Sequence, residues 1–473
     1  MMLTYSFTDI GSDSLYEHLY KCIKNDILCG TLAAGEKLPS KRNFAKNLGI
    51  SVITVENAYA RLIAEGYIYS LPKKGFYVSE IKNSAIQQRQ EYASFTDTSL
   101  PSHSTYLADF TSNYVPADQF PFSIWSKILR DVLHDNPEEL LQKPSGFGLP
   151  ALRRSISEYL QAFRGMNVNP DQIIIGAGTE YLYGLIVQLL GRDLCYAVED
   201  PSYPKIAMIY QLSGAKCVHI PLENSGIRIH ELEKSGADVA HISPSHHFPT
   251  GIITPVSKRY ELLGWATKNR NRYIVEDDYD SEFRMVGKPL PTLRSIDTTE
   301  KVIYMNTFSK SMTATMRVSY MVLPMHLAER YRKNMACFSC PVSTLIQTAL
   351  SKFMDSGSFE RHINRMRQYY KKQRDLIISE IKNSKMNDYV EISEADAGLH
   401  FIIHIKTKLS DTDFKNQLLR RKIKISPLSE YYATPENKTQ HKFIINYSSL
   451  TAGQIREAIA VISEEVTSAV KQP

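Results

Sequence analysis

The sequence predicts two folded parts of different classes: a small helical module that ends in a β-hairpin, over residues 1–80, and a much larger α/β body, over residues 109–473. Three observations predict this division. Apolar residues recur at helical spacing before residue 66, short apolar runs alternate with helical segments after residue 109, and the stretch between lacks sustained apolar periodicity. A chain of 473 residues is long enough for two or three domains with cores of their own.

Composition excludes several classes of protein. Apolar residues make up 43% and charged residues 22% of the chain, which is typical of a globular protein rather than a disordered or fibrous one. The longest apolar stretch, residues 173–191, contains Glu180 and several glycines, so no membrane span is expected. The N-terminus lacks the pattern of a secretory signal, and the six cysteines are too few and too scattered for a disulfide framework. A cytoplasmic protein with reduced cysteines is therefore expected.

Three amphipathic helices are predicted before residue 66. The first carries apolar residues at helical spacing, namely Leu15, Leu19, Cys22, Ile23 and Ile27. Ser40 is suited to cap a second helix that ends at Gly49, and Ser51 to cap a third that ends at Gly66.

A β-hairpin follows the third helix. Residues 67–71 and 76–78 have the pattern of strands, and residues 72–75 (Pro-Lys-Lys-Gly) form a turn with a basic tip. A helix, a helix pair joined by a short turn and then a hairpin make the pattern of a winged helix-turn-helix.

Basic residues are concentrated in the same module. The whole chain has a formal charge of +6, and residues 37–79 alone hold seven Lys and Arg residues against Glu56 and Glu65. This concentration favours a polyanionic partner, and nucleic acid before a membrane surface, because the segment is not a long cationic amphipathic helix. A solvated charged face is the alternative for the charge, and a protein-interaction module is the alternative for the motif.

Over about residues 10–80 the chain resembles the GntR superfamily of bacterial regulators. The resemblance rests on segments 35–42 (Gly-Glu-Lys-Leu-Pro-Ser-Lys-Arg), 48–51 (Leu-Gly-Ile-Ser) and 65–67 (Glu-Gly-Tyr). It implies binding to double-stranded operator DNA, with phosphate contacts by Ser40, Lys41 and Arg42, major-groove contacts by Ser51, Thr54 and Asn57, and a wing at Lys73, Lys74 and Gly75 that approaches the minor groove. Val52 stands where the family commonly has arginine, so readout of guanine by that residue is not implied.

A connector and the α/β body follow. Residues 81–108 are predicted to be an extended linker. The strand-like runs beyond it predict a largely parallel sheet, and they are residues 173–175, 194–198, 217–220, 239–242, 273–275, 302–305 and 318–322. From about residue 355, a long basic helix near 361–384 and strands near 401–405 and 443–445 predict a separate C-terminal α+β subdomain.

Lys310 is the first of four signals for a cofactor. It ends the segment Asn-Thr-Phe-Ser-Lys directly after a predicted strand, and Arg317 follows seven residues later. A lysine beside a strand end can form a Schiff base with an aldehyde, and Thr307, Ser309 and Arg317 can surround a phosphate. Alone this spacing is weak, because a lysine in a turn is usually only a surface residue.

The other three signals also follow predicted strands. Residues 176–180 (Gly-Ala-Gly-Thr-Glu) form a glycine-flanked turn before a helix, which is suited to cradle a phosphate with Gly178, Thr179 and Glu180. Asp277 can pair with a protonated pyridine nitrogen, and Tyr279 can hydrogen-bond a ring hydroxyl. Residues 199–203 (Glu-Asp-Pro-Ser-Tyr) place the aromatic face of Tyr203 after another strand.

Together these segments resemble the fold type I, aspartate-aminotransferase-like enzymes that bind pyridoxal 5'-phosphate (PLP), over residues 109–465. Segments 145–154 and 249–251 add to the resemblance. It implies the following roles: Lys310 as the Schiff-base lysine, Asp277 as the partner of the pyridine nitrogen, Tyr279 at the ring oxygen, Tyr203 stacked on the ring, and Thr179, Ser309 and Arg317 at the phosphate.

The fusion of the two parts resembles the MocR subfamily of GntR regulators, through segments 243–251, 276–283 and 427–432. This resemblance implies a transcriptional regulator that keeps an aminotransferase fold as a sensor of an amino compound or of PLP itself, and a head-to-tail homodimer. Two alternatives remain: an active aminotransferase that carries a DNA-binding module, and a regulator whose cofactor is purely structural.

Two departures from working aminotransferases predict little or no turnover. Those enzymes usually have Asn before Pro-Thr-Gly and an Arg clamp for the substrate carboxylate, where this chain has Phe248 and Ile444. Lys205 and Lys442 can still attract the carboxylate of an effector, but a point charge orients a carboxylate less well than an arginine fork.

No metal site is predicted. Cys337 and Cys340 have the spacing of a redox or zinc pair, but no second pair accompanies them. His246 and His247 lie beside the predicted cofactor loop and are interpreted as residues of that loop rather than as metal ligands.

Overall fold

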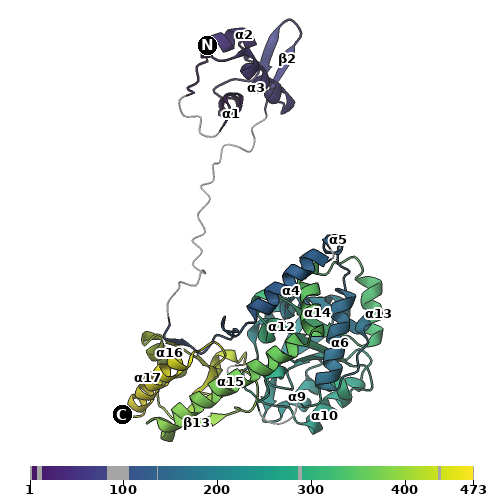
Figure 1. Cartoon of the computed structure of the whole chain (residues 1–473), viewed down its shortest axis with the longest axis vertical. Helices are drawn as coiled ribbons and strands as arrows, with labels where there is room; N and C mark the ends of the chain where they lie inside the picture. The colour runs from purple at the N-terminus through teal and green to yellow at the C-terminus, as the bar shows by residue number, and fades with distance from the viewer. Residues whose placement is uncertain are drawn as a thin grey trace. The chain divides into compact units, whose positions relative to one another are not determined.

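A computed structural model of the chain describes residues 3–7, 13–81, 106–135, 137–285, 290–434 and 438–471. The chain forms two compact units, one within Met1–Ser102 and one within His103–Pro473 (Figure 1). Most of the predicted linker, residues 82–105, lies outside the described residues. In the part of the chain that the structure describes, no helix is long and apolar enough to cross a membrane.

The N-terminal unit contains the three predicted helices and the hairpin. The helices are α1 (Leu15–Leu28), α2 (Lys41–Leu48) and α3 (Val52–Ala64), and the strands are β1 (Lys37–Leu38), β2 (Ile68–Leu71) and β3 (Gly75–Val78). Both predicted caps form, because the hydroxyls of Ser40 and Ser51 accept from backbone N–H groups in the first turns of α2 and α3. The strand β1, which pairs antiparallel with β3, was not predicted, because two residues are too few to show a periodicity.

The N-terminal unit has a hydrophobic core of its own. Its largest fully buried members come from all three helices and include Leu19, Phe44, Val55, Tyr59 and Leu62. Because Val55, Tyr59 and Leu62 hold α3 against this core, the residues on the other side of α3 face outward.

An eight-stranded mixed sheet forms the centre of the second unit. Its strands are β5 (Ile173–Gly176), β6 (Cys195–Asp200), β7 (Lys216–Glu223), β8 (Gly226–Ile227), β9 (Val239–Ile242), β10 (Tyr273–Asp277), β11 (Val302–Thr307) and β12 (Ser319–Val322). The order is β5-β12-β11-β10-β9-β6-β7-β8. The inner pairs are parallel, while β12 runs antiparallel to both of its neighbours. The predicted largely parallel sheet is therefore confirmed.

Helices cover both faces of this sheet. One face packs against α7 (Thr179–Leu190), α8 (Pro204–Leu212) and α13 (Met325–Asn334). The other face packs against two groups, which are α4 (Phe122–Asp135), α6 (Pro150–Arg164), α14 (Thr344–Asp355) and α15 (Ser358–Asn383) on one side, and α9 (Ile229–Lys234), α10 (Val256–Thr267) and α11 (Leu293–Ile296) on the other. The short helices α5 (Pro137–Leu140) and α12 (Phe308–Ser311) complete the set. The result is a three-layer α/β body.

The C-terminal part forms the predicted α+β subdomain. A four-stranded sheet has the order β13 (Val390–Ser393), β14 (His400–Ile405), β17 (Lys442–Asn446) and β16 (Ser426–Pro427), and α15 packs beside α17 (Ala452–Lys471). Figure 1 shows α16 (Asp411–Arg420) and α17 gathered in yellow at one end of this unit. The strand β4 (Ala108–Asp109) begins at the last residue of the predicted linker and pairs in parallel with β15 (Ile423–Lys424).

Candidate functional site

The residues predicted to hold a cofactor gather at one edge of the large sheet. Strands β5, β6, β10 and β11 end at this edge. Asp277 is the last residue of β10, and the segments after β5, β6 and β11 carry Gly178, Tyr203 and Lys310. Because β12 is antiparallel, Arg317, two residues before its start, reaches the same edge. Ligands in open α/β sheets bind at the carboxyl ends of the strands, so this edge is the candidate site.

Lys310 lies in α12, directly after β11. Its Nζ donates to the backbone oxygen of Asn113 at 3.3 Å. Burial lowers the pKa of the Lys310 ammonium, although the nearby carboxylate of Asp280 opposes that shift. A lowered pKa increases the fraction of neutral amine, which is the nucleophilic form that attacks an aldehyde.

Asp277 has one carboxylate oxygen engaged and one without a partner. Its Oδ2 accepts from the Tyr183 hydroxyl at 2.6 Å and lies 3.4 Å from His241 Nε2, while His241 Nδ1 is 2.6 Å from the hydroxyl of Tyr210. Its Oδ1 is buried and has no hydrogen-bond partner among the described residues. An unpartnered buried carboxylate oxygen is costly unless something binds it, and a protonated pyridine nitrogen fits that position.

The glycine-flanked turn and Arg317, predicted to hold a phosphate, lie against each other. Gly178 has a φ of 94°, which residues with a side chain rarely adopt, and a Cβ there would lie 2.4 Å from Arg317 Nη2 and displace that guanidinium. Thr179 begins α7, and the hydroxyls of Thr307 and Ser309 lie 2.9 Å apart. Arg317 Nη2 donates to Ala177 O and to Glu180 Oε2, both at 3.2 Å. The Glu180 carboxylate therefore binds the Arg317 guanidinium in this structure, and an anion that binds Arg317 must compete with that carboxylate.

Tyr203 and Lys205 lie at the start of α8. The ring of Tyr203 is 39% exposed and meets the ring of Phe248 edge-on, with centroids 6.0 Å apart. The ammonium of Lys205 lies 6.0 Å from the centre of the Tyr203 ring and pairs with Glu180 at 3.1 Å. The exposed ring surface of Tyr203 is available to a planar ligand, while Lys205 already has a carboxylate partner.

Three buried side chains that were not assigned to the cofactor, His246, Asp280 and His400, form a cluster, and the charge of Lys310 acts on Asp280 and His400. His246 Nδ1 lies 2.9 Å from Asp280 Oδ2 and 3.3 Å from the Tyr279 hydroxyl, and its ring is 4.6 Å from that of His400. Burial and nearby carboxylates raise the pKa of Tyr279 well above its usual value, so its hydroxyl stays a donor. The absence of a side chain at Gly398 leaves room for the His246 ring, because a Cβ there would lie 1.9 Å from His246 Cε1. The segments come from far apart in the chain, which is why spacing alone could not find them.

The same cluster has the residue types of a metal site. Potential ligand atoms of His246, Asp280 and His400 lie within 4.8 Å of one another, and imidazole and carboxylate are ordinary zinc ligands. His246 and Asp280 already bond each other, and the charge of Lys310 acts on both Asp280 and His400, which opposes a second cation. The prediction that the protein binds no metal stays a prediction.

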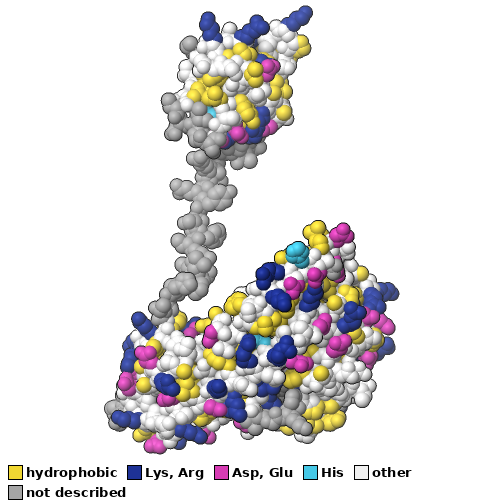
Figure 2. Space-filling view, in the orientation of Figure 1, with side chains coloured by type: hydrophobic (Ala, Val, Ile, Leu, Met, Phe, Trp, Pro, Cys, Tyr) yellow, Lys and Arg dark blue, Asp and Glu magenta, His cyan; other side chains and the backbone are white. Residues whose placement is uncertain are grey.

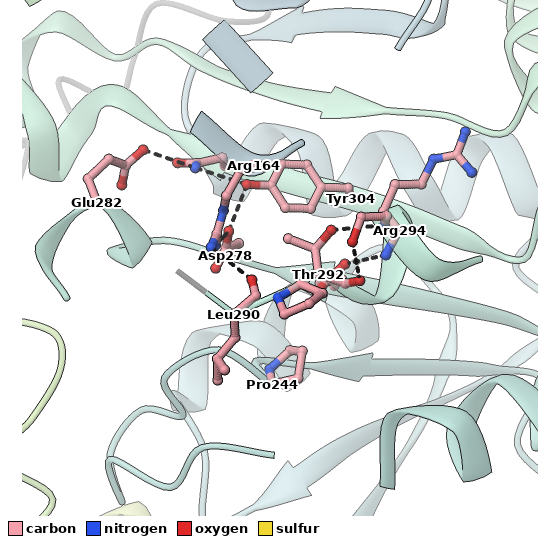
Figure 3. Close-up of polar contacts among 12 residues, drawn as sticks. Arg164, Pro244, Asp278, Glu282, Leu290, Thr292, Arg294 and Tyr304 are labelled. Atoms are coloured by element: carbon pink, nitrogen blue, oxygen red, sulfur yellow. Dashed lines mark hydrogen bonds and ion pairs between the residues drawn. The ribbon is translucent and has the colours of Figure 1, made fainter. Parts of the chain in front are cut away.

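Asp278 belongs to a different network from Asp277. It forms a buried ion pair with Arg164 and accepts from the Tyr304 hydroxyl at 2.7 Å (Figure 3). Asn306 Nδ2 extends the network by donating to both Tyr304 and Glu282 at 3.2 Å. Burial is the largest single influence and opposes ionisation, but the charge of Arg164 together with the hydrogen bonds from Arg164 and Tyr304 outweighs it and lowers the pKa of Asp278. Asp278 Oδ1 is also buried without a hydrogen-bond partner among the described residues, but its Oδ2 is held by Arg164, so Asp277 is the better candidate of the two for a cofactor ring.

Several buried acids near the site have raised pKa values. Burial raises the pKa of Glu199 to about 8, and the charge of Asp277 adds to that shift. Glu199 Oε2 accepts from Ser243 N at 2.9 Å and lies 3.4 Å from Nε2 of His247, whose pKa burial lowers to about 3. A neutral acid facing a neutral imidazole is consistent with both shifts.

These shifts predict how stability depends on pH. A carboxyl group with a raised pKa in the folded state stabilises the fold at low pH, and this contribution is lost as the pH rises through the folded pKa. Buried histidines act in the opposite sense, but only below their ordinary pKa of about 6.5. The free energy of unfolding should therefore fall between pH 6.5 and 8, with Glu199 contributing about 1 to 2 kcal/mol of that fall.

The test is denaturant unfolding of Glu199→Gln at pH 6.5 and pH 8. The loss of stability between the two pH values should be smaller in Glu199→Gln than in wild type, and the exposed control Glu391→Gln should show the same loss as wild type. If Glu199→Gln loses as much stability as wild type, the assignment to Glu199 is contradicted.

The positions predicted to contact an effector are separated. Lys442 lines a cavity of about 400 Å³ together with Arg228, Glu394 and Tyr432, whereas Lys205 pairs with Glu180. Ile444 is buried and pairs with Ile402 of β14, on the face of the small sheet that also carries His400. That face approaches the loop of Pro249, because His400 Nε2 lies 3.2 Å from Pro249 O. The apolar side chain of Ile444 therefore lies on the face of the small sheet from which an arginine would bind a substrate carboxylate in a working aminotransferase.

The predicted DNA contacts lie on one module. Ser40, Arg42, Ser51, Asn57, Lys73 and Lys74 are exposed, and Lys41 and Gly75 are partly exposed. Lys41 pairs with Glu56 at 2.6 Å, and the hydroxyls of Ser51 and Thr54 lie 2.8 Å apart. Asn57 projects from the outer side of α3, and Lys73 and Lys74 form the tip of the β2–β3 hairpin.

Comparisons with known proteins agree with both units. Residues 15–78 match the model of the bacterial regulatory proteins of the gntR family, and residues 107–462 match aminotransferase class I and II. The uncharacterized HTH-type transcriptional regulator YdeL of Bacillus subtilis is 33% identical over 94% of this chain and 95% of its own length. The probable rhizopine catabolism regulatory protein MocR of Rhizobium meliloti is 29% identical over 94% of this chain and 92% of its own. A Pyrococcus horikoshii kynurenine aminotransferase is similar in structure, with a TM-score of 0.68 and 20% identity over 78% of this chain and 93% of that one.

A GntR-type winged helix joined to a fold type I aminotransferase-like domain defines a DNA-binding transcriptional regulator. This chain belongs to the MocR-type subfamily of the GntR regulators. The predicted family, fold class and regulatory role are therefore confirmed.

Proposed function

We propose that this regulator binds PLP through Lys310 and that its aminotransferase-like domain senses an amino compound, or PLP itself, to change operator binding. The observation that carries the proposal is the unpartnered, buried Oδ1 of Asp277 at the same sheet edge as Lys310 and the Gly178–Arg317 cradle. A pyridine ring with an aldehyde and a phosphate has the three groups that these three features would bind.

Each residue at this edge has a role in the proposal. Lys310 holds the cofactor covalently, and Asp277 keeps a proton on the ring nitrogen because its other oxygen is fixed by Tyr183. Tyr279 donates to the ring oxygen, and Tyr203 covers the ring. The phosphate is held by Gly178, Thr179, Thr307, Ser309 and Arg317. When bound, PLP supplies an electrophilic carbon for amines and a ring that withdraws electrons.

Lys310 also connects the site to the small subdomain. Its Nζ donates to Asn113 O, and the Asn113 side chain accepts from Ser448 Oγ at 2.8 Å. We propose that displacement of Lys310 changes this contact and shifts the domain between two states, which residues 81–108 pass to the DNA-binding module. A head-to-tail homodimer in the cytoplasm, where operator DNA is accessible, completes the proposal.

The test is a measurement of DNA affinity as a function of cofactor and amine. The full chain is used to select duplexes from random DNA, and affinity for the selected DNA is measured with and without PLP and with a panel of amino acids. Wild type should respond by at least about tenfold, within the range of ordinary allosteric couplings. Lys310→Ala should not respond, whereas the exposed control Lys216→Ala should behave as wild type. An unchanged affinity under every condition would show that the cofactor is purely structural.

The wing lysines provide a separate prediction. Replacing Lys73 and Lys74 together with Gln removes two predicted phosphate contacts while keeping the length of each side chain. Affinity should fall by a similar factor on all DNA sequences, and the slope of log affinity against log salt should decrease by about one for each lost contact. Lys21→Gln, on α1 and paired with Asp13, is the matched control and should keep the slope. An unchanged slope in the double variant would place the wing away from DNA.

A further inference from the structure

The N-terminal end of α3 exposes two large aliphatic side chains. Ile53 is 68% exposed and Val52 is 42% exposed, although both follow the cap at Ser51 directly. The core residues Val55, Ala58, Tyr59 and Leu62 lie on the side of the helix opposite Ile53, and Val52, three residues before Val55, lies at the margin of that core-facing side. Ile53 is therefore not needed for the packing of α3, and the exposure of both side chains to water is unfavourable in the free protein.

The polar groups around these two residues are already engaged. Ser51 Oγ accepts from Thr54 N at 3.0 Å and also bonds the Thr54 hydroxyl, and Glu56 pairs with Lys41. Farther along α3, Arg61 pairs with Glu65 and Glu17. Among the predicted base-reading residues only Asn57 keeps a polar side chain without such an engagement in the described contacts. The exposed surface at the N-terminal end of α3, formed by Val52 and Ile53, is therefore mainly apolar.

Basic side chains flank this apolar surface. Lys41 and Arg42 begin α2, and Lys73 and Lys74 form the tip of the hairpin. Figure 2 shows Lys and Arg side chains projecting from one end of the N-terminal unit beside yellow hydrophobic surface. An apolar surface bordered by cations is complementary to a duplex, whose phosphates border the base edges of the major groove.

We propose that Ile53, together with Val52, reads thymine methyl groups in the major groove of the operator. The argument rests on the DNA-binding role of this module. In that groove the C5-methyl of thymine is the apolar group that base pairs present, while guanine and adenine are read by hydrogen bonds. Ile53 and Val52 cannot make such bonds, so they distinguish bases only through contact with methyl groups. The operator half-site then carries thymine opposite the start of α3.

The test replaces thymine with uracil, which removes only the methyl group. Duplexes are selected from random DNA with the full-length protein, and each thymine of the consensus is then replaced by uracil. At one or two positions of each half-site, wild-type affinity should fall by about fourfold for each methyl removed. The Ile53→Ala variant should bind the thymine duplex more weakly and should no longer distinguish thymine from uracil at the position that Ile53 contacts.

Two further variants make the result specific. Ile63→Ala removes an aliphatic side chain that is 38% exposed on the same helix, about 15 Å from Ile53 along the axis, and should keep the thymine-to-uracil ratio. Val52→Arg should shift selection at one position from thymine to guanine. The salt dependence of Ile53→Ala should equal that of wild type, because its phosphate contacts are intact.

Three results would overturn the inference: equal binding of uracil and thymine duplexes by wild type, a retained ratio in Ile53→Ala, or a consensus without thymine in the half-sites. Failure to select any duplex is a different result, because it would refute DNA recognition by the module itself.

Discussion

Replacing Lys310 with alanine should abolish covalent attachment of PLP to the protein while leaving the fold intact. Lys310 combines the two properties that attachment needs: an amine whose pKa is lowered by burial, and a position between Asn113 and the charge of Asp280 at the sheet edge. The Lys310 side chain lies beside polar groups rather than within the hydrophobic core, so truncation leaves that core in place. The expected effect is all or none, since alanine cannot react with an aldehyde.

The measurement is borohydride reduction of the PLP-treated protein followed by peptide mapping. In wild type the modified peptide should contain Lys310, and in Lys310→Ala the visible absorbance and the modified peptide should both be lost. Lys205→Ala is the informative control, because Lys205 lies on the same edge but is exposed and paired with Glu180. Its variant should still be labelled at Lys310. Labelling of any other lysine in wild type would refute the assignment.

The sheet edge could be predicted from the sequence because its strands are strongly patterned. The seven apolar runs coincide with β5, β6, β7, β9, β10, β11 and β12, and the chemistry-bearing residues follow them directly. Buried strands of an α/β sheet consist almost entirely of apolar residues, so the ends of these strands can be recognised in the sequence. Asp277 ends β10, Gly178 and Lys310 follow β5 and β11, and the parallel direction of these strands then brings all three residues to one edge.

The partners of these residues could not be predicted in the same way. The sequence did not distinguish the environments of Asp277 and Asp278, which are neighbours in the chain, yet one bonds Tyr183 and the other Arg164. In the cluster of His246, Asp280 and His400, the first two are 34 residues apart in the chain, and His400 is more than a hundred residues from both. Such contacts depend on tertiary packing, for which local periodicity carries no signal.

Amino compounds should change the absorption of the PLP-bound protein without sustained transamination. Exchange of a ligand amine for Lys310 requires only a free amine, whereas turnover requires a substrate held with its reacting bond correctly oriented, and a displacement of about 1 Å can cost ~100-fold. The structure offers little to orient a carboxylate. Ile444 is buried and apolar, and Phe248 packs against Tyr203, His400 and Tyr431. Lys205 is paired with Glu180, and Lys442 lies at a separate cavity with Glu394.

The measurement is keto-acid formation over many protein equivalents, across a panel of amino acids and with and without selected DNA. We expect a spectral response with at most about one keto acid per protein. Ile444→Arg places a guanidinium on the face of β17 that would carry the missing clamp, and it should raise turnover if the absence of that clamp limits the reaction. Ile402→Arg, at the paired position on β14, is the matched control for an arginine buried on the same face and should not raise turnover. Sustained turnover by wild type at about 1 per second or faster would be an ordinary enzymatic rate. That result would show that Lys205 or Lys442 orients the substrate despite the engagements seen here, and that the chain is an active aminotransferase with a DNA-binding module.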